Sequence, residues 1–524
     1  MIGQRTPNTT GNHPRHRRRK VETEVHRRLK PPSTHTGRQL RRDTCTRAPQ
    51  SCPSDTILIS ADATATIMIP TNSPIRLEHL KPRVKRLWDL SAAKIRSLEK
   101  SWQPGAGSPV FTVEGAYTSR GWTEWTQGFQ FGAAILQYDA TGEAEFLEIG
   151  RSRTVAAMAP HLSHTGVHDH GFNNVSTYGN LLRLMKEGRT PASPWEQNFY
   201  EVALKCSAAV QAARWSRTAA GGGYIYSFNG PHSLFVDTIR SLRSLGVGHR
   251  LGHVLMGEGD RRISLLERLL QHAASTAAYS VFYGEGRDAY DVRGRTVHEC
   301  IFNINDGNFR CPSSQQGYSP FTTWTRGLAW AMCGFAEQLE FLATVDDAEL
   351  APFGGRESIT GKMRKAAEAT CDFYIENTPP DGIPYWDTGA PGLAHMGDYL
   401  NRPADPFNDY EPVDSSAACI AAQGLLRLGR HLKNDRYWNA GLLVAHTLFD
   451  EPYLAVDPAH QGLILHSVYH RPNGWDHIPA GRKVPCGESS MWGDYHAREL
   501  SLYLQRIIEN KPYLTFWRGA ENYS

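Results

Sequence analysis

The sequence predicts an all-α fold: a toroid of about six helical hairpins, in which paired helices bury their apolar faces between two concentric layers. Three observations lead to this prediction. Apolar residues recur at helical spacing from Ile75 nearly to the end of the chain. The spacers between helical segments alternate between short and long, as in a ring with tight turns on one side and functional loops on the other. Strand signals are confined to short pieces, notably residues 297–303.

The helices are expected in order along the chain, and their end signals support them. Asp414 and the serines after it offer N-cap oxygens to one helix, and Gly429 lies near the end of that helix. Residues 431–435 form a short spacer, whereas residues 377–413 form a long one rich in Gly, Pro and Trp. The predicted helices are 77–98, two between 129 and 147 with a break at 139–142, 174–187, 194–216, 233–245, 262–282, 322–344, 361–377, 415–431, 436–449 and 489–509.

The first part of the chain differs from the rest. Residues 1–65 are polar, basic and rich in Pro, Thr and Arg without an apolar period, which predicts a disordered tail before a single domain at 66–524. An alternative is that translation begins at Met68. Residues 1–50 carry 13 Lys or Arg and three acids, a net of +10, so the remainder carries −6 of the total +4. The basic run at 15–20 lacks interleaved aromatics, so no nucleic-acid partner is expected.

Composition narrows the class of protein further. The 13 Trp, 21 Tyr and 19 Phe residues suit a carbohydrate enzyme as well as a large core. Nine scattered cysteines without a C-x-x-C pair argue against disulfide and zinc frameworks, and we expect Cys333 and Cys419 to be small core residues. No stretch is apolar enough to span a membrane or to act as a secretory signal, which predicts a cytoplasmic protein.

Two acids in apolar or aromatic surroundings are the candidate catalytic residues. Asp169 lies in His168-Asp169-His170-Gly171-Phe172, and Asp237 follows Ser-Leu-Phe-Val. Burial raises the pKa of a carboxyl group, which is what a proton donor working near neutral pH needs. With a helix starting near residue 232, Asp237 would lie two turns in, on a face away from the apolar stripe. The alternative is structural: Asp169 caps a loop, and Asp237 caps a helix or pairs with Arg240.

Five further residues are candidates for substrate contact. Trp125 precedes a Gly-Phe pair at a helix entry, His298 lies on a short extended piece, and Gln316 lies in a loop that contains glycine. Arg326 and Trp330 are four apart on one helix face, where a guanidinium could fork onto a carboxylate while the ring stacks on a pyranose. An Arg stacked on a core Trp explains this pair equally well.

The order of these motifs resembles a known family. Trp-x-x-Gly-Phe is followed by His-Asp-x-Gly-Phe, an acid, a lone His, Gln-Gly before Trp-x-Arg-Gly-x-Ala-Trp, Tyr-Trp-Asp, Asp-Ser-Ser-Ala-Ala and Gly-Asp-Tyr. This order, from about Trp122 to Leu504, resembles the unsaturated glucuronyl hydrolases of glycoside hydrolase family 88 and their family 105 relatives, the unsaturated rhamnogalacturonyl hydrolases. The most specific pieces are residues 168–172, 324–330 and 414–418.

The resemblance implies an (α/α)6 barrel that acts on oligosaccharides with a 4,5-unsaturated uronic acid at the non-reducing end. The implied reaction is hydration of a vinyl ether, which differs from displacement at the anomeric carbon. Asp237 would act as general acid and then base, and the charge of Asp169 would help to keep Asp237 protonated. The residues around the reactive end would be Trp125, His168, His298, Gln316, Arg326 and Trp330. The resemblance implies no metal and no organic cofactor.

The chain departs from the family pattern at several positions, which leaves the substrate open. Leu328 replaces the usual Gln in Arg-Gly-Gln-Ala-Trp, and Gln130-Phe-Gly132 replaces an aromatic-Pro-Gly. The spacing from Asp237 to His298 indicates an insertion at 247–258 or 284–296. Alternatives are therefore an unsaturated rhamnogalacturonyl hydrolase, an intact-uronide hydrolase, a catalytically silent sugar-binding toroid and, more remotely, a nucleic-acid-associated protein recruited by its tail.

Overall fold

The computed structural model describes residues 69–70, 72, 74–103, 105–120 and 124–517. The chain divides into two units, residues 1–62 and 63–524, and every described residue belongs to the second. The predicted basic tail, the alternative start at Met68 and the motif residue Trp122 lie outside the described residues. No helix in the described ranges combines the length and apolarity needed to cross a membrane.

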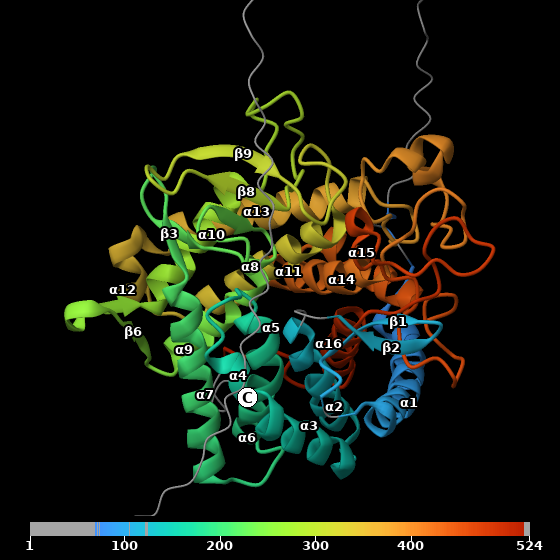
Figure 1. The fold of residues 1–524 in the computed structure, drawn as a ribbon, viewed down its shortest axis with the longest axis horizontal. Helices are drawn as coiled ribbons and strands as arrows, with labels where there is room; N and C mark the ends of the chain where they lie inside the picture. Colours follow the sequence, from blue (N-terminus) through green and yellow to red (C-terminus); the bar gives the residue numbers. More distant parts are fainter. Residues whose placement is uncertain (1–68, 71, 73, 104, 121–123, 518–524) are drawn as a thin grey trace, which may run out of the picture. The chain divides into compact units, whose positions relative to one another are not determined.

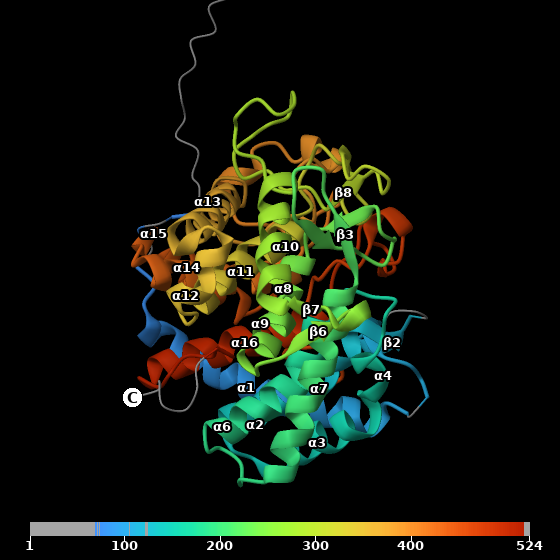
Figure 2. The same ribbon diagram turned by 90° about the vertical axis from the view of Figure 1, so that its left-hand side faces the viewer.

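Six helical segments form an inner ring (Figures 1 and 2). They are buried on almost every side, as expected of helices enclosed by other helices. Each contacts the next around the ring, and the last contacts the first. In chain order they are α2 (Gln127–Thr141), α5 (His170–Asn174) continued by a π-helical turn (Val175–Gly179) and α6 (Asn180–Lys186), α8 (Thr238–Ser241) with α9 (Arg243–Arg250), α11 (Thr325–Leu342), α14 (Ser415–Leu432) and α16 (Met491–Ile508).

Six amphipathic helices form the outer layer and alternate along the chain with the inner segments. Each packs on an inner neighbour, giving the pairs α1–α16, α2–α3, α6–α7, α9–α10, α11–α13 and α14–α15. Short helices α4 (Ala159–Leu162) and α12 (Asp347–Leu350) lie in the connections. The predicted toroid of six hairpins is therefore confirmed. The outer helices are α1 (Leu77–Ser101), α3 (Ala144–Ala157), α7 (Pro194–Ala213), α10 (Leu265–Tyr279), α13 (Gly355–Glu376) and α15 (Asp435–Leu448).

Strands in the described part of the chain are short and belong to the loops. Three two-stranded sheets pair β1 (Pro109–Val113) with β2 (Ala116–Ser119), β3 (Trp215–Arg217) with β4 (Gly223–Ile225) and β6 (Val254–Met256) with β7 (Arg262–Ser264). A three-stranded antiparallel sheet has the order β5 (Ser233–Phe235), β8 (Glu299–Phe302), β9 (Phe309–Ser313). It matters for function, because the backbone N–H of Val236 donates to the carbonyl of His298 at 2.9 Å and so places His298 beside Asp237.

The structure corrects two local predictions. The helix expected at 233–245 begins only at Thr238, because Ser233–Phe235 pairs with β8. The expected C-cap Gly429 lies inside α14, which ends at Lys433 in the left-handed conformation. A Cβ on Gly429 would lie 2.6 Å from the backbone nitrogen of Trp438, so this glycine lets α14 and α15 approach closely.

Other local predictions are confirmed. Asp414 caps α14 by accepting from the backbone N–H groups of Ser416 and Ala417. Cys333 and Cys419 are fully buried core residues.

Buried charges at the inner ring are paired. Arg240 of α8 donates to Glu337 of α11 and to Glu499 of α16 at 2.6 Å each, and Arg243 donates to Glu499 at 3.0 Å. All four side chains are almost completely buried. A buried charge is tolerated only when it is compensated in this way, so the network ties three inner helices to one another.

Candidate active site

The two candidate acids occupy equivalent places in the ring. Asp169 immediately precedes α5 and Asp237 immediately precedes α8, yet neither side chain caps its own helix. Asp237 also does not pair with Arg240, whose partners are Glu337 and Glu499. The structural alternatives of capping and ion pairing with Arg240 are therefore wrong. Each carboxyl group is about 8% exposed and faces a cavity at the middle of the ring.

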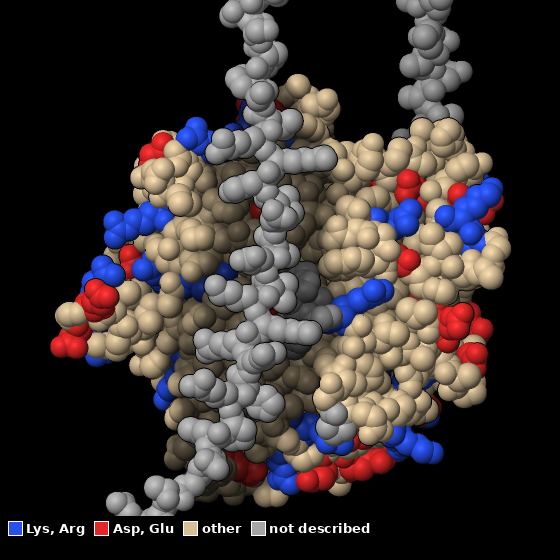
Figure 3. Space-filling model, in the orientation of Figure 1, with Lys and Arg blue, Asp and Glu red and all other residues tan. Residues whose placement is uncertain are grey.

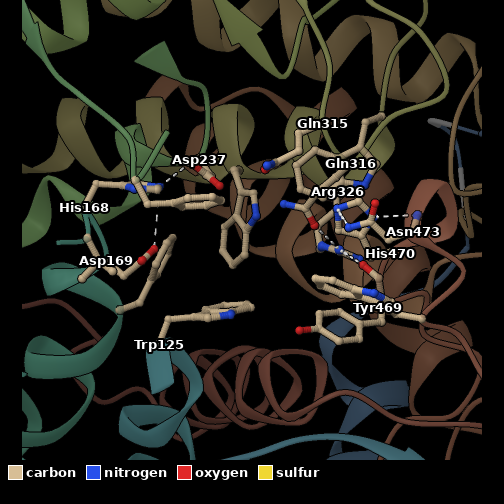
Figure 4. Close-up of a pocket in the computed structure, with 16 residues that line it drawn as sticks. Trp125, His168, Asp169, Asp237, Gln315, Gln316, Arg326, Tyr469, His470 and Asn473 are labelled. Atoms are coloured by element: carbon tan, nitrogen blue, oxygen red, sulfur yellow. Dashed lines mark hydrogen bonds and ion pairs between the residues drawn. The ribbon is translucent and has the colours of Figure 1, made fainter. Parts of the chain in front are cut away.

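His168 bridges the two acids (Figure 4). Its Nε2 lies 3.2 Å from Oδ1 of Asp237 and 3.7 Å from Oδ1 of Asp169. The imidazole ring stacks on Phe228 and meets the edge of Phe235, with centroid distances of 6.0 Å and 5.5 Å. Nδ1 is buried and has no hydrogen-bond partner among the described residues. The ring is therefore held rigidly, with one nitrogen shared by two carboxyl groups.

The pKa directions at the acids differ from the expectation. Burial alone would raise the pKa of Asp237, but the hydrogen bond and charge of His168 outweigh burial and lower it. Burial raises the pKa of Asp169, and the charge of Asp237 adds to that effect. Burial opposes protonation of His168, but the two carboxyl groups prevail and raise its pKa. Asp237 is thus the stronger acid of the two, because its contact with the imidazole is shorter than that of Asp169.

The opposite wall of the cavity carries side-chain amides. Gln315 and Gln316 follow β9, and their backbone N–H groups donate to Nδ1 of His298 at 3.0 Å and 3.2 Å. These bonds require the His298 tautomer that carries its proton on Nε2. Burial lowers the pKa of His298 to about 4, so the ring is neutral. Its Nε2 is buried and has no hydrogen-bond partner among the described residues.

Arg326 lines the cavity but is not free to fork onto a ligand. One terminal nitrogen donates to Asp414 at 2.8 Å and to the carbonyl of Val468, and the other donates to Oε1 of Gln316 at 3.0 Å and to the carbonyl of Tyr469 at 2.7 Å. The expectation of a fork onto a substrate carboxylate is therefore wrong. Since Oε1 of Gln316 is occupied, the amide nitrogen of that side chain is the part available to a ligand.

Aromatic rings complete the walls. Trp125 stacks on Trp492 with centroids 5.1 Å apart, and Trp330 packs on Phe172 with centroids 4.9 Å apart. Trp125, Trp330 and Phe172 all line the cavity. The guanidinium of Arg326 lies 4.7 Å from the Trp324 ring centroid and 5.0 Å from that of Trp492, so it packs on tryptophans other than Trp330, the partner considered from the sequence.

Together these residues line a cavity that is open to solvent. On the face drawn in Figure 3, the charged side chains that are visible lie mainly toward the outer edge. Every predicted site residue except His298 lines the cavity, and His298 lies directly behind Gln315 and Gln316. No group of three or more His, Cys, Asp or Glu side chains in the described ranges is arranged to hold a metal ion.

Sequence reasoning missed part of the lining. The missed residues come from three loops, and the Gly, Pro and Trp content of their surroundings was the available signal. Asp476 accepts from the backbone N–H of His470 at 3.1 Å and of Tyr469, which shapes the loop before α16. The missed lining residues are Phe228 and Gln315, and Tyr469, His470, Asn473 and Trp475 before α16.

Comparison with known proteins finds similar sequences over about three quarters of the chain. No protein-family model matches the chain. An unsaturated glucuronyl hydrolase of Formosa agariphila is 25% identical over 390 residues, covering 74% of this chain and 81% of that protein. An unsaturated glucuronyl hydrolase of Bacillus sp. strain GL1 is 25% identical over 399 residues, covering 74% and 87%. The chain is thus similar to unsaturated glucuronyl hydrolases over about three quarters of its length.

A solved structure extends the relationship to the fold. The crystal structure of an unsaturated glucuronyl hydrolase specific for heparin matches with a TM-score of 0.63 at 18% identity, covering 82% of this chain and 98% of that one. This likeness confirms the (α/α)6 barrel. The predicted resemblance to unsaturated glucuronyl hydrolases is confirmed by the two sequence relatives.

Proposed function

We propose that this protein is a glycoside hydrolase that releases a 4,5-unsaturated uronic acid from the non-reducing end of lyase-generated oligosaccharides. The observation that carries the proposal is the pair of buried aspartates bridged by one imidazole, facing an amide wall, in a relative of unsaturated glucuronyl hydrolases. The aromatic walls suit a pyranose ring. The catalytic unit is residues 66–524.

The proposed reaction is hydration of the vinyl ether. Asp237 gives a proton to C4 of the unsaturated ring, and a water molecule adds its oxygen to C5 while its proton returns to Asp237. The product is a hemiketal at C5. Its ring opens to a ketone at C5 and a hemiacetal at C1, and the hemiacetal then releases the next sugar. The carboxyl group therefore acts first as acid and then as base, with no net change in its protonation.

This role requires the substrate to change the protonation of Asp237. The hydrogen bond and charge of His168 lower the pKa of this carboxyl group against the effect of burial and so favour its ionised form. The carboxylate of a bound uronate brings another negative charge into a cavity from which it displaces water, and both effects raise the pKa of a nearby acid. Asp169 is the partner acid, because its charge and its contact with His168 influence the protonation of Asp237.

The opposite wall binds the uronate in this proposal. The amide nitrogens of Gln316 and Asn473 are donors suited to a carboxylate or a hydroxyl, and Nε2 of His298 is a further buried donor. Arg326 does not contact the sugar through its terminal nitrogens but keeps Gln316 oriented. Trp125 and Trp330 are the rings on which the sugar packs.

A double-bond assay tests the proposal. The full chain is incubated with lyase-generated disaccharides from glycosaminoglycans, pectin and ulvan-type polymers while the far-ultraviolet absorbance of the conjugated double bond is followed. We expect absorbance loss with the wild type, and a rate lowered by about 10²–10⁴-fold in Asp237→Asn, the usual contribution of a positioned acid or base. Asp169→Asn should also slow the reaction, because it removes a carboxyl group from the contact with His168.

Isotopes separate this chemistry from other hydrolyses. In D₂O the product should carry deuterium at C4, because the proton that Asp237 delivers comes from solvent. Cleavage that leaves the absorbance unchanged, or a product without deuterium at C4, would contradict vinyl-ether hydration. Persistent absorbance with every disaccharide, in a protein that is folded by circular dichroism, would contradict the proposed substrate class.

A further inference from the structure

Asp387 of the Tyr-Trp-Asp motif does not line the cavity, yet it holds a segment that does. The side chain is fully buried. Its Oδ2 accepts from the backbone N–H of Tyr318 at 2.8 Å and its Oδ1 from that of Gly389 at 2.9 Å. No Lys, Arg or His of the described residues forms an ion pair with it. Burial raises its pKa to about 6, and the charge of Glu411 acts in the same direction.

The segment that Asp387 holds is residues 314–318, here called the glutamine segment. Four successive backbone N–H groups have fixed acceptors outside a helix or strand. Those of Gln315 and Gln316 donate to His298, and that of Gly317 donates to Oγ of Ser314 at 3.0 Å. The fourth, that of Tyr318, donates to Asp387. Such local bonds fix a loop without secondary structure.

The glutamine segment also fits tightly against its support. A Cβ on Gly317 would lie 2.6 Å from Oγ of Ser314 and 3.0 Å from Oδ2 of Asp387. Gln315 and Gln316 line the cavity on the other side of the same segment. A shift at Asp387 is therefore transmitted to the two amide side chains.

We propose that Asp387 is a positioning residue that sets substrate affinity by holding the glutamine segment in the cavity wall. This inference rests on the proposed function for its kinetic readout. The carboxylate is needed because it accepts at both oxygens. An asparagine accepts at only one oxygen, and its amide group would face the second N–H donor. Asp387→Asn therefore releases the backbone of either Tyr318 or Gly389.

The experiment compares Asp387→Asn with Asp381→Asn. Asp381 is a matched control, because it lies in the same loop, burial raises its pKa to about 6 as well, and it accepts backbone N–H groups from Ala404 at 3.1 Å and Ile383 at 3.4 Å. None of these control residues lines the cavity. We expect Asp387→Asn to raise KM at least about tenfold with little change in kcat, because uniform binding is lost. Asp381→Asn should leave KM unchanged.

Hydrogen exchange of the full chain provides a readout that does not depend on activity. Amide protons of the glutamine segment should exchange faster in Asp387→Asn and at the wild-type rate in Asp381→Asn. Gly317→Ala places a methyl group against Asp387 from the side of the glutamine segment and should reproduce the rise in KM. This variant replaces Asp387→Asn in the test if Asp387→Asn does not fold. A KM equal to that of the wild type in both Asp387→Asn and Gly317→Ala, or hydrogen exchange of the glutamine segment at the wild-type rate in Asp387→Asn, would overturn the inference. If the wild type does not turn over any disaccharide, the proposed function fails, and exchange alone decides the role of Asp387.

Discussion

Gly171→Ala should disable the site by moving one acid away from the other. Gly171 lies in α5, two residues after Asp169, and an added Cβ would lie 2.1 Å from the carbonyl oxygen of Ser241 in α8. Ordinary contacts of a Cβ begin at 3.4 Å. Helices α5 and α8 must therefore separate by about 1 Å, since packed backbones do not compress. Asp169 precedes one of these helices and Asp237 precedes the other.

The size of the effect follows from the contacts. Oγ of Ser241 accepts from the N–H of Gly171 at 2.9 Å and donates to the carbonyl of His168 at 2.8 Å. A separation of about 1 Å breaks these bonds and takes His168 beyond hydrogen-bond range of Asp237, now 3.2 Å away. Misplacement by about 1 Å typically costs about 10²-fold in rate, so kcat/KM should fall by about that factor. Overpacking should lower the unfolding free energy by about 1–3 kcal/mol.

The double-bond assay and urea unfolding measure these two changes. Gly361→Ala is the control, because Gly361 lies in α13 and a Cβ there meets no atom within 4 Å. It should keep full activity and stabilise the fold by about 0.5–1 kcal/mol. A folded Gly171→Ala variant with kcat/KM within about threefold of wild type would refute the reasoning that links the helix contact to the acids.

Three further predictions concern buried charge. Arg326→Lys should raise KM and lower the unfolding free energy by about 1–3 kcal/mol, because lysine keeps the charge but cannot replace the fork to Asp414 and Gln316; equal urea midpoints would contradict it. Glu499→Gln leaves two buried arginines undercompensated and should lower the unfolding free energy by about 3–5 kcal/mol. A double-mutant cycle with Arg243→Met measures the coupling between Glu499 and Arg243. Acid should unfold the protein between about pH 6.5 and pH 4, because buried histidines bind protons mainly in the unfolded state, about 1.4 kcal/mol per pH unit each. Asp381 and Asp387, whose pKa is raised to about 6, bind protons mainly in the folded state and so offset part of the loss of stability. A urea midpoint that stays constant from about pH 6.5 to pH 4 would contradict the prediction. The histidines, with pKa lowered to about 3 or 4, are His161, His170, His272, His298, His466, His470 and His496.

The hairpin architecture could be predicted because it depends on local periodicity. A 3.6-residue apolar period identifies each helix by itself, and alternating spacer lengths order the helices into pairs. The predicted helix at residues 415–431 matches Ser415–Leu432 because a capping aspartate and an uninterrupted apolar pattern agree there. The prediction of a helix over the whole of 233–245 was wrong, because the structure of its first residues depends on a distant part of the chain. Ser233–Phe235 has side chains that suit either a helix or a strand, and pairing with β8, more than 60 residues away, decided between them.

The sequence by itself determined that Asp169 and Asp237 face the cavity together with Trp125 and Trp330, because motif order and residue type identify chemistry that needs a fixed set of side chains. Tertiary structure alone decided how they act. The pKa of Asp237 is lowered and not raised, because His168 lies nearer to it than to Asp169. Arg326 is committed to Asp414 and to backbone carbonyls near residue 468, which lie far away in the chain. Such distances depend on how the helices pack, and a one-dimensional pattern of residue types does not contain them.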